Sequence, residues 1–303
     1  MTANRIFIRD RITDAAMVRR FSIVTALALT ACVAAPETTL PAPAEPVFYT
    51  QQVVAAKIPI RASSATDPAA LDAARTMVEG MLAFRPDLAS WLVANDYRVA
   101  IIAEEETILD VPENAHWTKP KPDDPRLTRC ERKLYDERIG SLTDAAYWNA
   151  RARGIGGDRT VGSEEDILGW PSSRYYGETI FVHEFAHNVL FAIEGADPAL
   201  YARVEAAYQN ALTTGLWKDE YTVTTVQEYW AEGTQFWFDS NRLQVFEGRR
   251  ILDHEDVARY DPALYAVLAE AYGDNHRLAS DPFYLSAARV PPGPPPRNTA
   301  EVC

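Results

Sequence analysis

The chain has 303 residues, of which 47% are hydrophobic and 11% aromatic, with 43 Asp and Glu against 30 Lys and Arg. This composition excludes an intrinsically disordered chain, and the negative mean hydropathy excludes a multi-span membrane protein. The net charge of −13 becomes −16 once the first 31 residues, with five Arg and two Asp, are set aside. Because binding to a phosphate backbone depends on Lys and Arg, we expect no nucleic-acid partner.

The N-terminal residues have the pattern of a lipoprotein signal peptide. Two arginines precede an apolar run over 21–31, which is too short to cross a bilayer but suits the core of a signal peptide. The run ends in Leu-Thr-Ala followed by Cys32, which resembles the bacterial lipobox, where the cysteine is lipidated and becomes the mature N-terminus. A plain secretory signal is the alternative. We expect residues 1–31 to be a signal peptide, with Met17 as an alternative start.

Residues 32–47 are rich in Pro and Ala and predict an extended tether. Val33, rather than Asp, follows the cysteine, as in Gram-negative lipoproteins of the outer membrane that face the periplasm. The resemblance implies a protein of the cell envelope that contacts the membrane only through the lipid on Cys32.

Two cysteines remain when Cys32 carries lipid. The periplasm is oxidising, so the pair Cys130 and Cys303 suggests a disulfide. Such a bond would hold the Pro-rich C-terminal tail, 291–303, against the body of the protein. Two unpaired thiols are the alternative.

Residues 48–290 contain no repeat and no second linker, and we interpret them as one catalytic domain. We expect an α+β fold that is mostly helical with a small mixed sheet. Residues 111–128 are expected to be a loop. Strands are predicted over 57–63, over 98–103 and, after a glycine turn, within 153–168. Helices are predicted from Thr66-Asp67-Pro68 onward, after Pro86, and over 177–195, 196–213, 224–241 and 261–272.

The predicted helix 177–195 is apolar on nearly every side, which is typical of a buried helix. It contains the motif His183-Glu184-Phe185-Ala186-His187. Residues four apart share one face of a helix, so both histidines can bind one metal ion, and Glu184 can hold the water that attacks a substrate. Burying an ionised Glu184 without a metal or a polar cleft would be costly. Because so short a motif also arises by chance, the third ligand matters.

A catalytic zinc ion needs three protein ligands and one open position. Glu228 and Glu232 stand four apart on one face of an otherwise apolar helix, so one could bind the metal while the other accepts the free N–H of a metal-bound histidine. Alternatively, Thr225 and Glu228 match a capping box that starts the helix. His116 is expected to be solvated. The candidates for the third ligand are Glu194, Glu205, Glu220, Glu228, Glu232, His254 and His276.

The two motifs, HEFAH and EYWAE, resemble the gluzincin metallopeptidases, and most closely the catalytic domain of anthrax lethal factor and its relatives. The resemblance covers only about 177–240. It implies a zincin-like fold around a buried HExxH helix, with one zinc ion per chain. The implied ligands are His183, His187 and Glu228, with Glu184 as the general base and Glu232 as a hydrogen-bond partner behind them.

The same resemblance implies that Tyr221, seven residues before Glu228, stabilises an oxyanion. The segment before the HEFAH helix offers Arg174, Tyr175 and Tyr176 as alternative donors. By analogy with zincins, a peptide could align along a strand at about 160–168. The sequence therefore predicts a zinc-dependent peptidase of the cell envelope with a peptide or protein substrate. A zinc-binding lipoprotein without activity and a zinc hydrolase acting on a non-peptide amide are the alternatives.

Overall fold

The computed structural model describes residues 48–293, apart from 126, 128 and 247. The predicted signal peptide 1–31, the tether 32–47 and most of the tail 291–303 lie outside the described residues, so these assignments stay predictions. Within the described ranges, none of the helices combines the length and the hydropathy that a membrane crossing requires.

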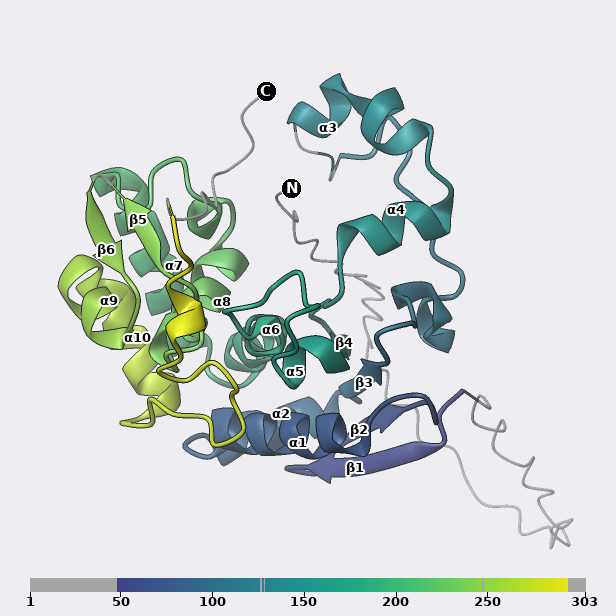
Figure 1. Cartoon of the computed structure of the whole chain (residues 1–303). Helices are drawn as coiled ribbons and strands as arrows, with labels where there is room; N and C mark the ends of the chain where they lie inside the picture. Colours follow the sequence, from purple (N-terminus) through teal and green to yellow (C-terminus); the bar gives the residue numbers. More distant parts are fainter. Residues whose placement is uncertain (1–47, 126, 128, 247, 294–303) are drawn as a thin grey trace, which may run out of the picture.

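A four-stranded mixed sheet lies at one end of the molecule (Figure 1). The first pair is antiparallel, and the two following pairs are parallel. The turn between the first two strands places Ala56 and Lys57 at positive φ, as tight hairpins require. The sequence predicted the second and third strands but missed the first. In spatial order the strands are β1 (Gln51–Ala55), β2 (Ile58–Ala62), β3 (Arg98–Ile102) and β4 (Arg159–Ser163).

Two helices connect β2 to β3 and cover one face of the sheet, namely α1 (Pro68–Leu82) and α2 (Pro86–Ala94). Both begin with proline in the first turn, and the Asp67 side chain accepts the N–H of Ala69 at 2.8 Å as the cap of α1. Both helices were predicted from these signals. Alternate residues of β3 face the main core beneath the helices.

The opposite face of the sheet is covered by the long connection from β3 to β4 (Figure 1). Trp148 and Ile139 pack there in a second, smaller core with Ile102 and Val161 of the sheet. The described residues of the predicted loop 111–128 are irregular except for one 3-10 turn. The connection contains the short elements η1 (Ile108–Asp110), η2 (Pro112–Asn114), α3 (Arg129–Lys133), η3 (Asp136–Gly140) and α4 (Asp144–Arg151).

Cys130 in α3 is buried and disulfide-bonded. No other cysteine belongs to the described residues, because Cys32 and Cys303 lie outside them. The pairing of Cys130 with Cys303 therefore stays a prediction. Mass spectrometry of disulfide-linked peptides from the non-reduced protein tests it, and a peptide that links Cys130 to Cys32 would contradict it.

Helix α6 (Ile180–Ala196) runs through the centre of the molecule and is buried from Ile180 to Ile193, as its apolar sequence predicted. It packs against the sheet, α1 and α2 on one side and against α7 (Pro198–Thr214) and α8 (Val226–Trp237) on the other. The short helix α5 (Glu164–Ile167) comes just before it and carries Asp166. Helix α6 is therefore the buried central element around which the other residues of the site lie.

The remaining elements complete the helical side of the molecule (Figure 1). Helix α8 ends at Trp237 rather than at the predicted residue 241, because Asp239 takes a left-handed φ of 54° and turns the chain back. The predicted helices at 196–213 and 261–272 are present, and the predicted α+β class is confirmed. The other elements are η4 (Tyr221–Val223), β5 (Gln244–Phe246), β6 (Arg249–Ile251), α9 (His254–Tyr260), α10 (Pro262–Tyr272) and η5 (Ala287–Arg289).

Candidate metal centre

Helices α6 and α8 bring together His183, His187 and Glu228 as a buried cluster that could hold a metal ion. One ligand atom from each residue lies within 4.8 Å of the other two. The two imidazole rings are 4.9 Å apart at 84°, and Nε2 of His183 lies 3.0 Å from Oε2 of Glu228. Over the described residues, no second group of three or more His, Cys, Asp or Glu side chains meets the same condition.

A hydrogen bond between the two motifs sets how α8 crosses α6. The indole N–H of Trp230 donates to the carbonyl oxygen of Ala186 at 3.1 Å. Ala186 lies between the two histidines of α6, and Trp230 lies between Glu228 and Glu232 of α8. The bond therefore ties the middle of EYWAE to the main chain of HEFAH.

Glu228 lies at the start of α8 and also in the cluster. Its backbone N–H donates to Oγ1 of Thr225 at 3.1 Å, so Thr225 does cap α8. Its carboxylate turns inward to His183 and is buried. The helix cap and the metal cluster are thus compatible, because the cap uses the main chain of Glu228 and the cluster uses its side chain.

The second ring nitrogen of His183 faces Gln235, a residue that the sequence reasoning missed. Nδ1 lies 3.2 Å from Oε1 of Gln235 and 3.6 Å from a carboxylate oxygen of Glu232. The amide of Gln235 is oriented by its own Nε2, which donates to the carbonyl oxygen of Thr179 at 3.1 Å. Oε1 of Gln235 can accept a proton held on Nδ1, and this tautomer would leave the lone pair of Nε2 for a metal. The missed signal was a glutamine seven residues after Glu228, on the same face of an apolar helix.

Glu232 lies behind His183, as the sequence suggested, and is fully buried. Its Oε2 accepts from Nδ2 of Asn241 at 2.9 Å and from Nε2 of Gln244 at 3.0 Å. The early end of α8 lets Asn241 reach back to Glu232. Gln244 comes from β5, and no sequence spacing indicated it.

Glu184 is buried beneath two glycines from the segment before β4. A Cβ on Gly154 would lie 3.0 Å from Cγ of Glu184. A Cβ on Gly156 would lie 2.7 Å from both the Glu184 carbonyl oxygen and Cδ2 of His187. Between them, Ile155 forms a single antiparallel bridge with Val161. The expected glycine turn is therefore also a close backbone crossing, and it requires glycine at 156, where a Cβ would meet a main-chain atom.

Two buried carboxyl groups hold the N-terminus of α6. The oxygens of Asp166 accept the N–H groups of Ile180 and Phe181 at 3.2 and 3.0 Å, and Asp281 accepts the hydroxyl of Thr179 at 2.6 Å. Burial raises the pKa of Asp166 well above its ordinary value and raises that of Asp281 to about 6. These contacts fix the start of the helix one turn before His183.

The other predicted residues fall in different places. Tyr221 is buried in η4, which packs against α8, whereas Tyr176 is 43% exposed and Arg174 donates to main-chain carbonyl oxygens. The predicted substrate strand at 160–168 is wrong beyond Ser163, because the chain turns into α5 to place Asp166. The remaining ligand candidates stay outside the cluster, namely Glu194, Glu205, Glu220, His254 and His276.

Neither a family model nor a curated protein matches this chain. Among solved structures, it is similar to that of the PRO-PRO endopeptidase PPEP-2 from Paenibacillus alvei. The identity is 15%, the TM-score is 0.40, and the match covers 67% of this chain and 91% of that chain. The interpretation of the site therefore rests on its own side chains.

Proposed function

We propose that the protein is a zinc-dependent metallopeptidase of the gluzincin type, with His183, His187 and Glu228 as the zinc ligands. The observation that supports this most is the buried cluster of two imidazoles and one carboxylate, within 4.8 Å of one another. Two histidines and one glutamate are a known ligand set of catalytic zinc, whereas structural sites usually use four protein ligands. The nitrogen and oxygen donors suit zinc, and a buried ionised carboxylate needs such compensation.

Zinc bound by these residues would act as a Lewis acid, polarising a peptide carbonyl and making a water molecule more acidic. Glu184 would take the proton from that water and deliver it to the leaving amine. Tyr221 would donate its phenolic hydroxyl to the developing oxyanion. Gln235 and Glu232 would keep His183 in the orientation and tautomer that a ligand needs.

The Glu184→Gln variant tests the mechanism. General acid–base catalysis contributes about 10²–10⁴-fold, so we expect a loss of that size in peptide cleavage while the zinc content stays that of the wild type. The control is Glu205→Gln, a change at an exposed position on α7. Retained activity in Glu184→Gln would contradict the proposal. Wild-type protein that binds zinc but cleaves no peptide in a library would favour a zinc-binding lipoprotein or a hydrolase of non-peptide amides.

We also propose that the enzyme is anchored to the outer membrane by lipid on Cys32 and faces the periplasm. The apolar run before Cys32 supports this location. Cell fractionation should find the wild type in the membrane fraction and Cys32→Ala in the soluble fraction. Equal partitioning of the two proteins would contradict the anchor.

A further inference from the structure

A cleft of about 600 Å³ lies between helix α6 and the second core. Its volume falls within the range of about 300–1,000 Å³ that small-molecule sites occupy. Residues 155–157 and the C-terminal part of α6 line it, whereas His183, His187 and Glu228 do not. The cleft is therefore a candidate binding site of its own, apart from the metal cluster.

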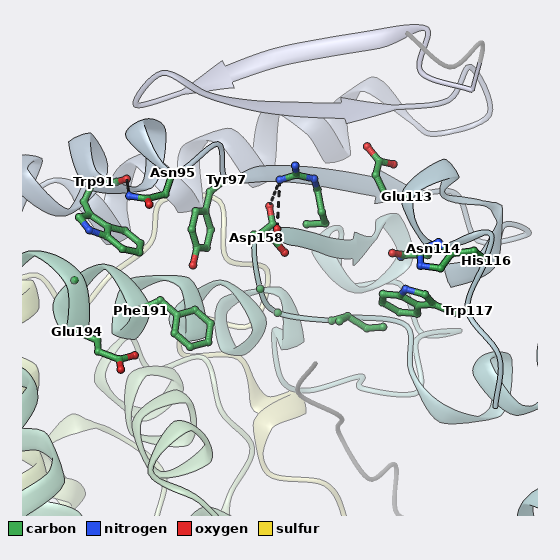
Figure 2. A pocket seen from close by; sticks show the side chains of 15 residues that line it. Trp91, Asn95, Tyr97, Glu113, Asn114, His116, Trp117, Asp158, Phe191 and Glu194 are labelled. Atoms are coloured by element: carbon green, nitrogen blue, oxygen red, sulfur yellow. Dashed lines mark hydrogen bonds and ion pairs between the residues drawn. The ribbon is translucent and has the colours of Figure 1, made fainter. Parts of the chain in front are cut away.

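Two partly buried tryptophans line this cleft at opposite ends (Figure 2). At one end, the ring of Trp117 packs against the second core, with its centre 5.0 Å from that of buried Trp148. At the other end, the indole of Trp91 rests on Gly195, where a Cβ would come within 2.2 Å of its Cε2 atom. Because each ring is held by a neighbour, the cleft offers two flat apolar surfaces in fixed positions.

The main chain that lines the cleft has already formed hydrogen bonds within the protein. Ile155 exchanges both of its main-chain bonds with Val161, at 3.0 and 2.9 Å. The N–H of Gly157 donates to Oδ1 of Asn188 at 3.0 Å, and its carbonyl oxygen accepts the hydroxyl of Thr160 at 2.7 Å. An extended peptide that binds by strand addition needs open main-chain N–H groups, and these two are taken. Side chains are therefore left to recognise the ligand.

The polar side chains of the cleft favour an uncharged ligand. The guanidinium of Arg159 lies 3.2 Å from the carboxylate of Asp96 and 3.7 Å from that of Asp158, so it is already compensated and the site does not suit an anion. Asn114 is buried at the cleft, and its amide Nδ2 has no hydrogen-bond partner in the part of the chain that the structure describes. Leaving a buried donor unpaired costs free energy. A ligand oxygen would recover this cost, whereas a cation brings no acceptor.

We infer that this cleft binds a neutral oligosaccharide, a function that goes beyond the proposed peptidase activity and does not depend on it. A sugar ring has a face of C–H groups, which packs on an aromatic ring because the face of that ring carries partial negative charge. Its hydroxyl groups both donate and accept, so Asp158 can accept from them and Asn114 can donate to them. With an indole at each end, the cleft suits a chain of several sugar rings better than a single one.

Calorimetric titration of the full chain with tetrasaccharides tests this site. The neutral probes are cellotetraose and its N-acetylated counterpart, chitotetraose, and the anionic probe is tetragalacturonate. We expect at least one neutral probe to bind. Tetragalacturonate should not bind, because the net charge of −13 on the chain repels it.

Two substitutions locate the binding in the cleft. Trp117→Ala removes a stacking surface, and Asp158→Ala removes an acceptor at an exposed position. We expect each change to weaken binding of the neutral probe about tenfold, and Trp117→Phe, which keeps an aromatic face, to weaken it less. The matched controls lie outside the cleft and should bind as the wild type does, namely Trp170→Ala at a partly buried tryptophan and Asp72→Ala at an exposed aspartate. If Trp117→Ala does not fold, Asp158→Ala decides.

Binding of neither neutral probe, tighter binding of tetragalacturonate, or an affinity that Asp158→Ala and a folded Trp117→Ala both leave unchanged would overturn the inference. Tighter binding of octaalanine than of the saccharides would also overturn it, because the cleft would then be a peptide site. The titration needs neither zinc nor turnover, so its result is separate from that for the proposed function. Saccharide binding by a protein that cleaves nothing would keep the site and reject the peptidase, and peptide cleavage without saccharide binding would do the reverse.

Discussion

At the scale of single residues, the centre depends on how His183 is held. Oε1 of Gln235 lies 3.2 Å from Nδ1, while the nearest oxygen of Glu232 is 3.6 Å away from it. Removing a partner of this kind costs about 10–100-fold in metal affinity. We therefore expect Gln235→Leu to weaken zinc binding by that factor, measured by competition with a chelator. Gln209→Leu, at an exposed position on α7, is the matched control; equal affinities in the two variants would contradict this role.

The predictability of the site also differs residue by residue. His183, His187 and Glu228 could be assembled from the sequence because each pair of positions falls on a regular helix with a fixed spacing. Asn241 and Gln244 could not, since their contact with Glu232 depends on where α8 ends and how the chain returns from Asp239. Gly156 was hidden for a similar reason, because its approach to His187 exists only when α6 packs beneath β4.

At the scale of elements, helices with strong local signals were predicted best. Proline in the first turn and an aspartate cap marked α1, and continuous apolar sequence marked α6. The errors lie where tertiary contacts decide, as at residues 164–168. There α5 replaces the expected strand, because Asp166 must reach the first N–H groups of α6. Strand β1 carried no signal of its own and depends on pairing with β2.

The start of α6 should make stability depend on pH. Burial raises the pKa of Asp281 from its ordinary 3.8 to about 6, so the folded state holds this proton more tightly than the unfolded state. Stability from this group is complete below pH 3.8 and is lost as the pH rises to about 6. The loss is about 3 kcal/mol at 1.36 kcal/mol for each pKa unit. Asp166 acts in the same direction.

Urea unfolding of the metal-free protein between pH 4 and 7 measures this dependence. We expect Asp281→Asn, which keeps an acceptor for Thr179 but cannot ionise, to lose less stability over this range than the wild type. Asp72→Asn, at an exposed position on α1, should behave as the wild type does. An identical decline in all three proteins would show that Asp281 is not the cause.

At the scale of the whole molecule, the fold brings together segments that are distant in the sequence. Helix α6 contacts both the sheet side and the helical side, so the HEFAH motif meets Glu228 from one direction and Gly156 from the other. The α+β class followed from composition and periodicity. The sequence did not predict the second core around Trp148 or the cleft between this core and α6, because the long connection over 103–158 has little periodicity.

The central claim is that His183, His187 and Glu228 form a zinc site, and zinc content tests it most directly. Mass spectrometry should find one zinc ion per chain in the reconstituted wild type and sharply less in Glu228→Ala. Glu131→Ala, which also removes a buried glutamate, there paired with Arg151, should keep its zinc. Full zinc content in Glu228→Ala would make Glu232 the next ligand to test. A folded, reconstituted wild type without zinc would contradict the account.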